Sequence, residues 1–301
     1  MAQTLENLSR QNETLTSIRG IVGTMKTLSA INAAPYEKAA LSIKAYHQTI
    51  LQGFAAFAHR AGDIALHAED AAEHWVVVFG SDHGLCGNYN EVLAKVVHQH
   101  CQAQAQAQAQ AQGKPHLLVI GAKLHGALVD QGLAPEVLLL PPASAEGIGR
   151  LAGEIVTRLD AMGQGQALHR LAVTLAFTQR GEEGDREPVT RQLLPLEPGL
   201  LQPGKRWHSR SLPDYHMATG ALLAALVRNH IFASVFRASA EAMVTENAAR
   251  LALMQQAEKS VDERRESVRG ELRSVRQTEI TDELMDIIMG FEALKKRKHP
   301  Q

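Results

Sequence analysis

The sequence is poor in the residues that build disulfide-rich or aromatic-rich β folds. It has two cysteines, Cys86 and Cys101, and aromatic residues make up 4% of the chain. Two cysteines without a pattern provide neither a disulfide framework nor the ligand spacing of a zinc site. A reducing, cytoplasmic setting is therefore the default expectation. The frequent Ala, Leu and Gln residues favour long helices.

The sequence also lacks an excess of charge of one sign and a long apolar run. Its formal net charge is −1, which argues against a general nucleic-acid binder. The polar start, MAQTLENLSRQNETL, is unlike a secretory signal. The longest nearly apolar stretch, around residues 217–227, is too short to span a bilayer. Any membrane association is therefore expected to come through partners.

Proline is absent from long parts of the chain. Only Pro35 precedes residue 115, most prolines lie between Pro115 and Pro213, and none occurs from Asp214 to His299. Because proline breaks helix interiors, both ends are free to form long helices and the middle is not. Pro35 should kink or interrupt the first helix near residue 34.

The C-terminal segment carries a narrow apolar seam. Met254, Val261, Val268 and Val275 recur every seven residues, and Leu272 adds a second position. Such a seam is typical of a coiled coil and requires a partner helix.

One face of the same segment is basic. It consists of Arg265, Arg269, Arg273 and Arg276. This face is either a solvated helix surface or a track for acidic partner surfaces, and the spacing alone leaves both readings open.

The N-terminal segment has the helical spacing of a possible partner for this seam. Its apolar residues recur mostly at intervals of three and four and are Leu5, Leu8, Leu15, Ile18, Val22, Met25, Leu28 and Ile31. The two terminal helices would then pair antiparallel.

The middle of the chain reads as an α/β domain. Short apolar runs at 75–79, 116–120 and 171–177 predict strands, and helices are expected at 90–101 and 148–159. This alternation predicts a parallel sheet. We therefore expect an α/β fold with a long antiparallel coiled coil: an N-terminal helix in 1–74, a Rossmann-like domain in 75–205, and a linker with a long helix in 206–301.

Two low-information stretches fall within the middle. The Gln/Ala tract at 102–112 is expected to be a helical extension or a mobile loop and receives no function. The Gly- and Pro-rich residues 181–213 should form loops or edge structure.

A loop with the sequence SDHGLCG follows the first predicted strand. It lies where phosphate-binding loops occur, but it has no lysine and fits neither common phosphate-binding motif. His83 and Cys86 alone make no metal site, and a reactive Cys86 would need a depressed pKa. We interpret Asp82, Gly84, Leu85, Cys86 and Gly87 as a tight strand-to-helix turn. No catalytic residue, cofactor or metal is predicted.

The motifs and their order resemble the γ subunits of F-type ATP synthases. The loop residues Ser81-Asp82 and Gly84-Leu-Cys-Gly87 are similar to the family's SDxGLCG signature. The segments TENAARLALM at 245–254 and RQTEITDE at 276–283 look like two further family signatures, and Gly290 with Ala293-Leu294 matches the closing pattern. The segment GIVGTMKTLSA at 20–30 resembles the corresponding segment of a divergent branch of the family, the alternate or sodium-type F-ATPases.

The resemblance implies a rotor shaft with no catalytic site of its own. Such a shaft would fill the α3β3 ring of F1 and also contact the ε subunit and the c-ring, at the cytoplasmic face of the bacterial inner membrane. The coupled ion, H⁺ or Na⁺, and the direction of the reaction stay open. By motif position, seven residues are implied in rotor–stator coupling: Lys26, Leu28, Glu246, Arg250, Gln277, Thr281 and Glu283.

Two alternatives compete with this interpretation. One is a nucleotide-binding α/β enzyme with long helical arms, for which mutation of Gly84 or Gly87 should abolish nucleotide binding. The other is a homodimeric coiled-coil scaffold, which would form a stable symmetric dimer.

Overall fold

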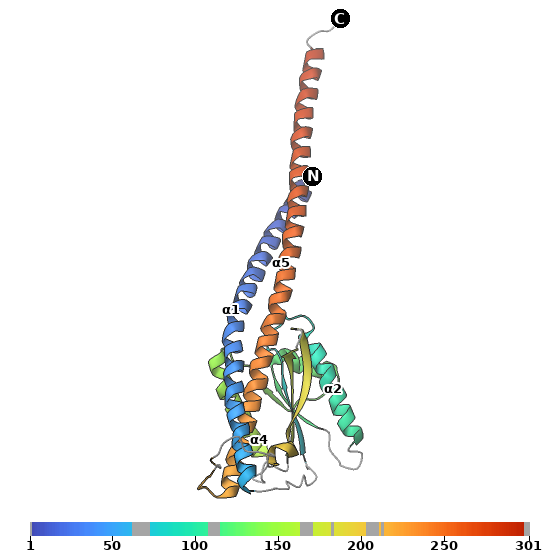
Figure 1. Cartoon of the computed structure of the whole chain (residues 1–301). Helices are drawn as coiled ribbons and strands as arrows, with labels where there is room; N and C mark the ends of the chain where they lie inside the picture. Colours follow the sequence, from blue (N-terminus) through green and yellow to red (C-terminus); the bar gives the residue numbers. More distant parts are fainter. Residues whose placement is uncertain are drawn as a thin grey trace. The chain divides into compact units, whose positions relative to one another are not determined.

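The computed structural model describes residues 2–61, 73–107, 115–162, 171–181, 184–202, 211 and 214–297. The chain separates into two compact units. Unit 1 consists of Met1–Leu28 and Leu251–Gln301, and unit 2 of Ser29–Arg250. The two long terminal helices are α1 (Ala2–Ala61) and α5 (Thr219–Arg297), both labelled in Figure 1. Each contributes residues to both units.

Unit 2 contains a five-stranded sheet in the order β3-β2-β1-β4-β5. Strands β1 (Glu73–Phe79), β2 (His116–Ile120), β3 (Val137–Leu139) and β4 (Leu171–Arg180) are parallel, and β5 (Arg186–Leu194) is antiparallel to β4. The predicted parallel sheet is thereby confirmed. Strand β5 lies at the sheet edge, within the stretch for which edge structure was expected.

The short helices of unit 2 follow the predicted alternation with the strands. Helix α2 (Tyr89–Ala107) and helix α4 (Ile148–Met162) contain the two predicted helices. The part of the Gln/Ala tract up to Ala107 extends α2, and its remainder lies outside the described residues. Helix α3 (Ala122–Asp130) and strand β3 were not predicted. Strand β3 is only three residues long, too short to give a recognisable apolar run.

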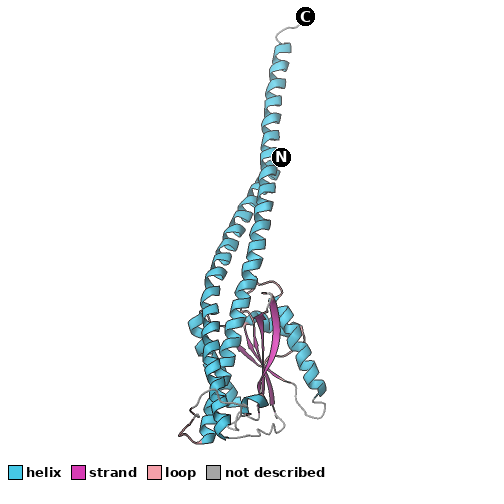
Figure 2. Ribbon diagram, in the orientation of Figure 1, coloured by secondary structure: helices cyan, strands magenta, loops and turns pink. Residues whose placement is uncertain are grey.

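Both faces of the sheet are covered, which explains the continuous apolar run of β1. Val76 and Val78 pack against α2 and α3 through residues such as Leu93 and Leu124. Val77 and Phe79 point to the opposite face, since side chains alternate along a strand. There they join a cluster with α1, α4 and α5 that includes Phe54, Ile155 and Ile231. Figure 2 shows the strands between these two groups of helices.

Unit 1 is an antiparallel pair formed by the first part of α1 and the second part of α5. Arg19 contacts Asp262 at 2.6 Å, and Lys26 contacts Glu258 at 2.6 Å. As residue numbers rise along α1, they fall along α5, so the predicted antiparallel pairing is confirmed.

The predicted seam of α5 is also confirmed. Met254 and Val268 are buried, and Val261, Leu272 and Val275 are half-buried. The predicted stripe of α1 is confirmed in part: Leu5, Leu8, Leu15, Val22 and Met25 are buried or half-buried. Ile18, Leu28 and Ile31 are exposed instead. Three- and four-residue spacing describes a wider stripe than the narrow seam that two helices share.

Helix α1 is not interrupted at Pro35, so this part of the prediction is wrong. The helix continues from Ala2 to Ala61 with Pro35 inside it. A proline inside a helix removes one backbone hydrogen bond, which costs about 3 kcal/mol. The next residue, Tyr36, is buried, and its hydroxyl donates to the Pro142 carbonyl at 3.2 Å. We infer that this packing offsets the lost bond.

Helix α5 also differs from the expectation that the apolar stretches of the chain are too short to span a bilayer. Among the described residues it contains a stretch long and apolar enough to cross a membrane by those two criteria alone. This is weak evidence, since core helices of soluble proteins pass the same test. Several apolar residues near the start of α5 pack against the core of unit 2 instead: Leu222, Leu223, Leu226 and Val227.

Candidate functional site

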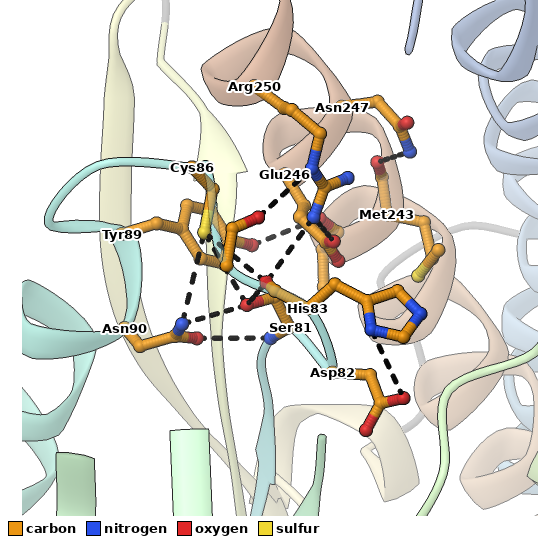
Figure 3. Close-up of polar contacts among 12 residues, drawn as sticks. Ser81, Asp82, His83, Cys86, Tyr89, Asn90, Met243, Glu246, Asn247 and Arg250 are labelled. Carbon is orange, nitrogen blue, oxygen red and sulfur yellow. Dashed lines mark hydrogen bonds and ion pairs between the residues drawn. The ribbon is translucent and has the colours of Figure 1, made fainter. Parts of the chain in front are cut away.

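The loop after β1 is closed by hydrogen bonds of buried polar side chains. The Ser81 backbone N–H donates to Asn90 Oδ1 at 3.0 Å, and Asn90 Nδ2 donates to Ser81 Oγ at 2.8 Å. Ser81 Oγ in turn donates to the His83 carbonyl at 2.9 Å. Asn90 lies in the first turn of α2, so these bonds fix the strand, the loop and the helix to one another (Figure 3).

Two residues of the loop have left-handed backbone conformations. Gly87 has φ of 66°, as the turn interpretation expected of a glycine, and Leu85 has φ of 65°. Gly84 does not adopt a positive φ. A leucine in this region is strained, and such strain is often found at functional sites. The Leu85 side chain is 51% exposed.

Helix α5 holds the loop through one arginine. Arg250 donates from Nε to the Gly84 carbonyl at 3.3 Å and from Nη2 to the His83 carbonyl at 3.4 Å. The same Nη2 atom lies 2.5 Å from Glu246 Oε1, one helical turn away. Because the loop presents carbonyl oxygens to a cation here, this side of it is unsuited to a phosphate.

The Glu246–Arg250 pair is largely removed from water. The two side chains are 6% and 12% exposed, respectively. Burial raises the pKa of Glu246, and the positive charge and hydrogen bond of Arg250 act in the opposite direction. The pair therefore joins the loop to α5. Burying each charge costs free energy, and the opposite charge of the partner reduces that cost.

Cys86 is not a reactive thiol in this structure. Its side chain is buried, and Sγ lies 3.5 Å from Ser81 Oγ. Burial raises the pKa of the Cys86 thiol, which is opposite to the depression that nucleophilic chemistry requires. The nearby helix start does not overcome this desolvation.

A second contact between α2 and α5 lies beside the loop. The Tyr89 hydroxyl is 3.0 Å from the Ala242 carbonyl and 3.1 Å from Thr245 Oγ1. Thr245 Oγ1 is also 3.0 Å from the Thr178 carbonyl at the end of β4. Thr245, whose segment resembles a family signature, therefore has a packing role that joins α5 to the sheet.

The acidic and histidine residues of the loop have separate roles. Asp82 Oδ1 accepts a hydrogen bond at 3.1 Å from the N–H of Ala122, the first residue of α3. His83 is mostly exposed, and its Nδ1 lies 3.8 Å from Asp82 Oδ2. In the part of the chain that the structure describes, no three His, Cys, Asp or Glu residues are placed to hold a metal ion.

The other residues implied in coupling lie in unit 1. Lys26 is paired with Glu258, and Leu28 is 48% exposed. Gln277, Thr281 and Glu283 are exposed on α5, and the Thr281 hydroxyl donates to the Gln277 carbonyl at 2.8 Å. The structure thus brings Glu246 and Arg250 to the loop and leaves the other five in unit 1.

The sequence reasoning missed several residues that hold the site together. Asn90 and Tyr89 anchor the loop to α2 and α5, and Glu258 and Asp262 pair with α1. Only the last two could have been found from the sequence. They flank Val261 of the seam, where coiled coils commonly place interhelical ion pairs.

Comparison with known proteins places the chain in a family. A sequence model described as ATP synthase matches residues 4–294. The chain belongs to the ATP synthase family.

Relatives of this ATP synthase family member span almost its whole length. The ATP synthase γ chain of an Anaeromyxobacter species is 28% identical, over 97% of this chain and 99% of the relative. The γ chain of Dinoroseobacter shibae is 26% identical, over 96% and 99%.

Solved structures share the fold of this family member. A chain of the Euglena gracilis mitochondrial ATP synthase, in a complex described as OSCP, F1 and c-ring, matches with a TM-score of 0.62 and 14% identity. That match covers 100% of this chain and 98% of the other. A chain from the rotor of the same enzyme matches with a TM-score of 0.60 and 14% identity, over 93% and 100%.

Proposed function

We propose that this chain is the γ subunit of an F-type ATPase, the central shaft that couples ion translocation to ATP synthesis or hydrolysis. The observation that carries the proposal is the family match over residues 4–294, together with γ-chain relatives that align over nearly their full length. The two rival interpretations are not favoured, since neither a nucleotide-binding enzyme nor a homodimeric scaffold accounts for this match.

The helix pair of unit 1 has the surface that a rotating shaft needs. Its apolar seam is narrow, and ion pairs such as Arg19–Asp262 lie beside it. Between residues 262 and 279, every exposed residue of α5 is charged or polar. A helix with mostly charged and polar surface can turn inside a protein ring without adhering to it, because exposed ion pairs contribute little binding energy.

The structure helps to distinguish the two interpretations of the basic face of α5, a solvated helix surface or a track for acidic partner surfaces. Arg265 and Arg273 are already paired within α5, to Asp262 and Glu266 respectively. Arg269 and Arg276 are exposed. This favours a largely solvated face, with two arginines available to acidic partner surfaces.

The exposed end of α5 indicates where partner subunits bind. Ile280, Leu284, Ile287 and Phe291 are between 54% and 74% exposed, and no part of α1 covers them in unit 1. Apolar side chains in this number are rarely left exposed on an isolated helix. The partners are the α and β subunits of F1, which would enclose this end, with the ε subunit and the c-ring bound elsewhere.

Within this assembly, we assign the seven coupling residues as the family motifs imply. Gln277, Thr281 and Glu283 contact β, with Lys26 and Leu28 on the facing helix, and Glu246 and Arg250 help to set the lower coupling region. The chain has no catalytic centre of its own and is a peripheral subunit on the cytoplasmic side of a bacterial membrane. Whether the branch is the sodium type stays a prediction.

The proposal is tested by shortening α5 in the assembled complex. Removal of the residues from Gln277 onward should reduce assembly or coupling, because the exposed apolar end and three proposed contact residues are lost. The measurement is ion pumping per ATP hydrolysed in membrane vesicles. A control variant lacking only residues 298–301 should behave like the wild type.

Point variants refine this test. Gln277→Ala and Thr281→Ala should each lower pumping per ATP hydrolysed, while Asp282→Ala, outside the implied set, should not. If the complex lacking residues from Gln277 onward assembles and couples normally, the site assignment is wrong.

A further inference from the structure

Unit 2 contains a cavity of about 500 Å³ to which the shaft role assigns no function. Helix α5 lines it with His230, Ser234 and Arg237, which lie on one face of the helix at spacings of four and three residues. Helix α1 contributes His47, β4 contributes Phe177 and β5 contributes Arg191. The volume falls in the range of small-molecule sites, about 300–1,000 Å³.

Two arginines line the same cavity, and among the described residues no carboxylate forms an ion pair with either. Arg237 is half-buried and has no hydrogen bond or ion pair within the described part of the chain. Arg191 donates from Nη2 to Gln179 Oε1 at 2.6 Å, and its guanidinium carbon lies 5.9 Å from the centre of the Phe177 ring. Burial and the positive charge of Arg237 lower the pKa of Arg191.

The histidines of the cavity do not add to this positive charge at neutral pH. His47 Nε2 lies 3.1 Å from His230 Nδ1, so the two rings share one hydrogen. Burial lowers the pKa of both imidazoles, that of His230 to about 4. They are therefore neutral hydrogen-bonding groups at pH 7, beside the hydroxyl of Ser234.

The acidic groups near the arginines are exposed or outside the lining. Glu197 is among the lining residues and is solvent-exposed. Glu241 and Glu187 act on Arg191 only through their charge, and neither forms an ion pair with it among the described residues. Two guanidinium groups facing one cavity repel each other, and a bound anion would remove this repulsion.

We propose that this cavity binds a small phosphate-bearing molecule, with its phosphate on Arg191 and Arg237. The guanidinium group presents N–H donors in a planar fork that matches phosphate oxygens, and two such groups balance a dianion. The leucines that complete the lining provide an apolar surface beside the charged end: Leu51, Leu175, Leu193 and Leu200.

The phosphate could belong to inorganic phosphate or to a nucleotide, and these two ligands would fill the cavity differently. Inorganic phosphate would fill only part of about 500 Å³. A nucleotide would also place its base or sugar against the apolar side. The inference does not rest on the shaft role, because the cavity lies entirely within unit 2 and uses none of the seven coupling residues.

The test is calorimetric titration of the full-length chain with inorganic phosphate and, separately, with ADP, at pH 7.5 and fixed salt. At least one of the two probes should bind, and Arg237→Gln and Arg191→Gln should each raise its Kd about tenfold or more, since each removes a charge-assisted hydrogen-bonding group. The matched control is Arg228→Gln, on the same helix but paired with Asp160 outside the cavity lining. This control should leave Kd unchanged.

The outcomes separate the sources and can overturn the proposal. Binding of phosphate alone identifies a simple oxyanion site, and tighter binding of ADP identifies a nucleotide site. No binding of either probe, or binding that Arg237→Gln leaves intact, overturns the proposal. Arg237→Gln should fold like the wild type, because Arg237 forms no hydrogen bond or ion pair with the residues that the structure describes. Its melting temperature without ligand should equal or exceed that of the wild type, and thermal unfolding measures this.

Discussion

At the scale of single residues, the Glu246–Arg250 pair decides how the loop after β1 is held. A buried carboxylate is tolerated only where a cation and hydrogen bonds compensate its lost hydration. Arg250 provides that cation and also binds the carbonyls of His83 and Gly84. Leu85, whose backbone is strained, directly follows these two residues in the sequence.

Replacing Arg250 with alanine should destabilise the protein by about 3 kcal/mol at pH 7, because it leaves the Glu246 carboxylate buried without its partner. Burial already raises the pKa of Glu246, and loss of Arg250 raises it further. The carboxyl then takes up a proton as the pH falls, so the destabilisation should be smaller at pH 5. Urea denaturation of both proteins at the two pH values measures this.

A matched control exists in α4. Arg158 and Glu154 form an ion pair of the same spacing, with 42% and 45% of their side chains exposed. Arg158→Ala should therefore cost less than about 1 kcal/mol. Equal losses for the two arginine variants, or a loss for Arg250→Ala that does not depend on pH, would contradict the assignment of Arg250.

At the scale of elements, the seam of α5 shows why a largely polar helix has a fixed partner. Val268 is fully buried in unit 1, although the surrounding residues Ser267 and Arg269 are exposed. Two seam positions per seven residues, such as Val268 and the half-buried Leu272, pack against the partner helix and leave the rest of the surface polar. Because the seam is narrow, Leu28 and Ile31 of α1 remain exposed.

Val268→Ala should lower the free energy of unfolding of the helix pair by about 2 kcal/mol, from lost apolar burial and the cavity that remains. The loss of helical circular dichroism on heating reports this change. Arg264→Ala, at an exposed position four residues earlier, is the control and should have almost no effect. A helix pair insensitive to Val268→Ala would show that the seam does not hold α1 and α5 together.

At the scale of the whole molecule, two half-buried histidines make the fold sensitive to acid. Burial lowers the pKa of both His74 and His230 to about 4. The unfolded chain has histidines with pKa near 6.5. Between about pH 6.5 and 4 the unfolded state therefore binds protons that the folded state excludes, and stability falls as the pH falls.

The urea midpoint of unit 2 should accordingly drop between pH 7 and pH 5. His74→Gln and His230→Gln should each reduce this drop, because glutamine does not titrate. His83→Gln, at a mostly exposed side chain, serves as the comparison for the substitution itself. A drop that neither His74→Gln nor His230→Gln alters would contradict the role of these two histidines.

The sequence by itself determined the plan of this protein. Proline placement predicted both terminal helices, heptad spacing predicted the seam at Met254 and Val268, and apolar runs predicted β1, β2 and β4. These features are local in sequence, so backbone propensity and periodicity carry them. The motifs at 245–254 and 276–283 indicated the family that the comparison confirmed.

Only the tertiary structure decided which side chains meet. We attribute the continuity of α1 through Pro35 to the packing of Tyr36. Cys86 and Glu246 are buried where residues of α5 contact the loop. The meeting of Arg191 and Arg237 in one cavity likewise joins β5 to α5. Such contacts join residues far apart in the chain, and their energies depend on desolvation, which no local pattern records.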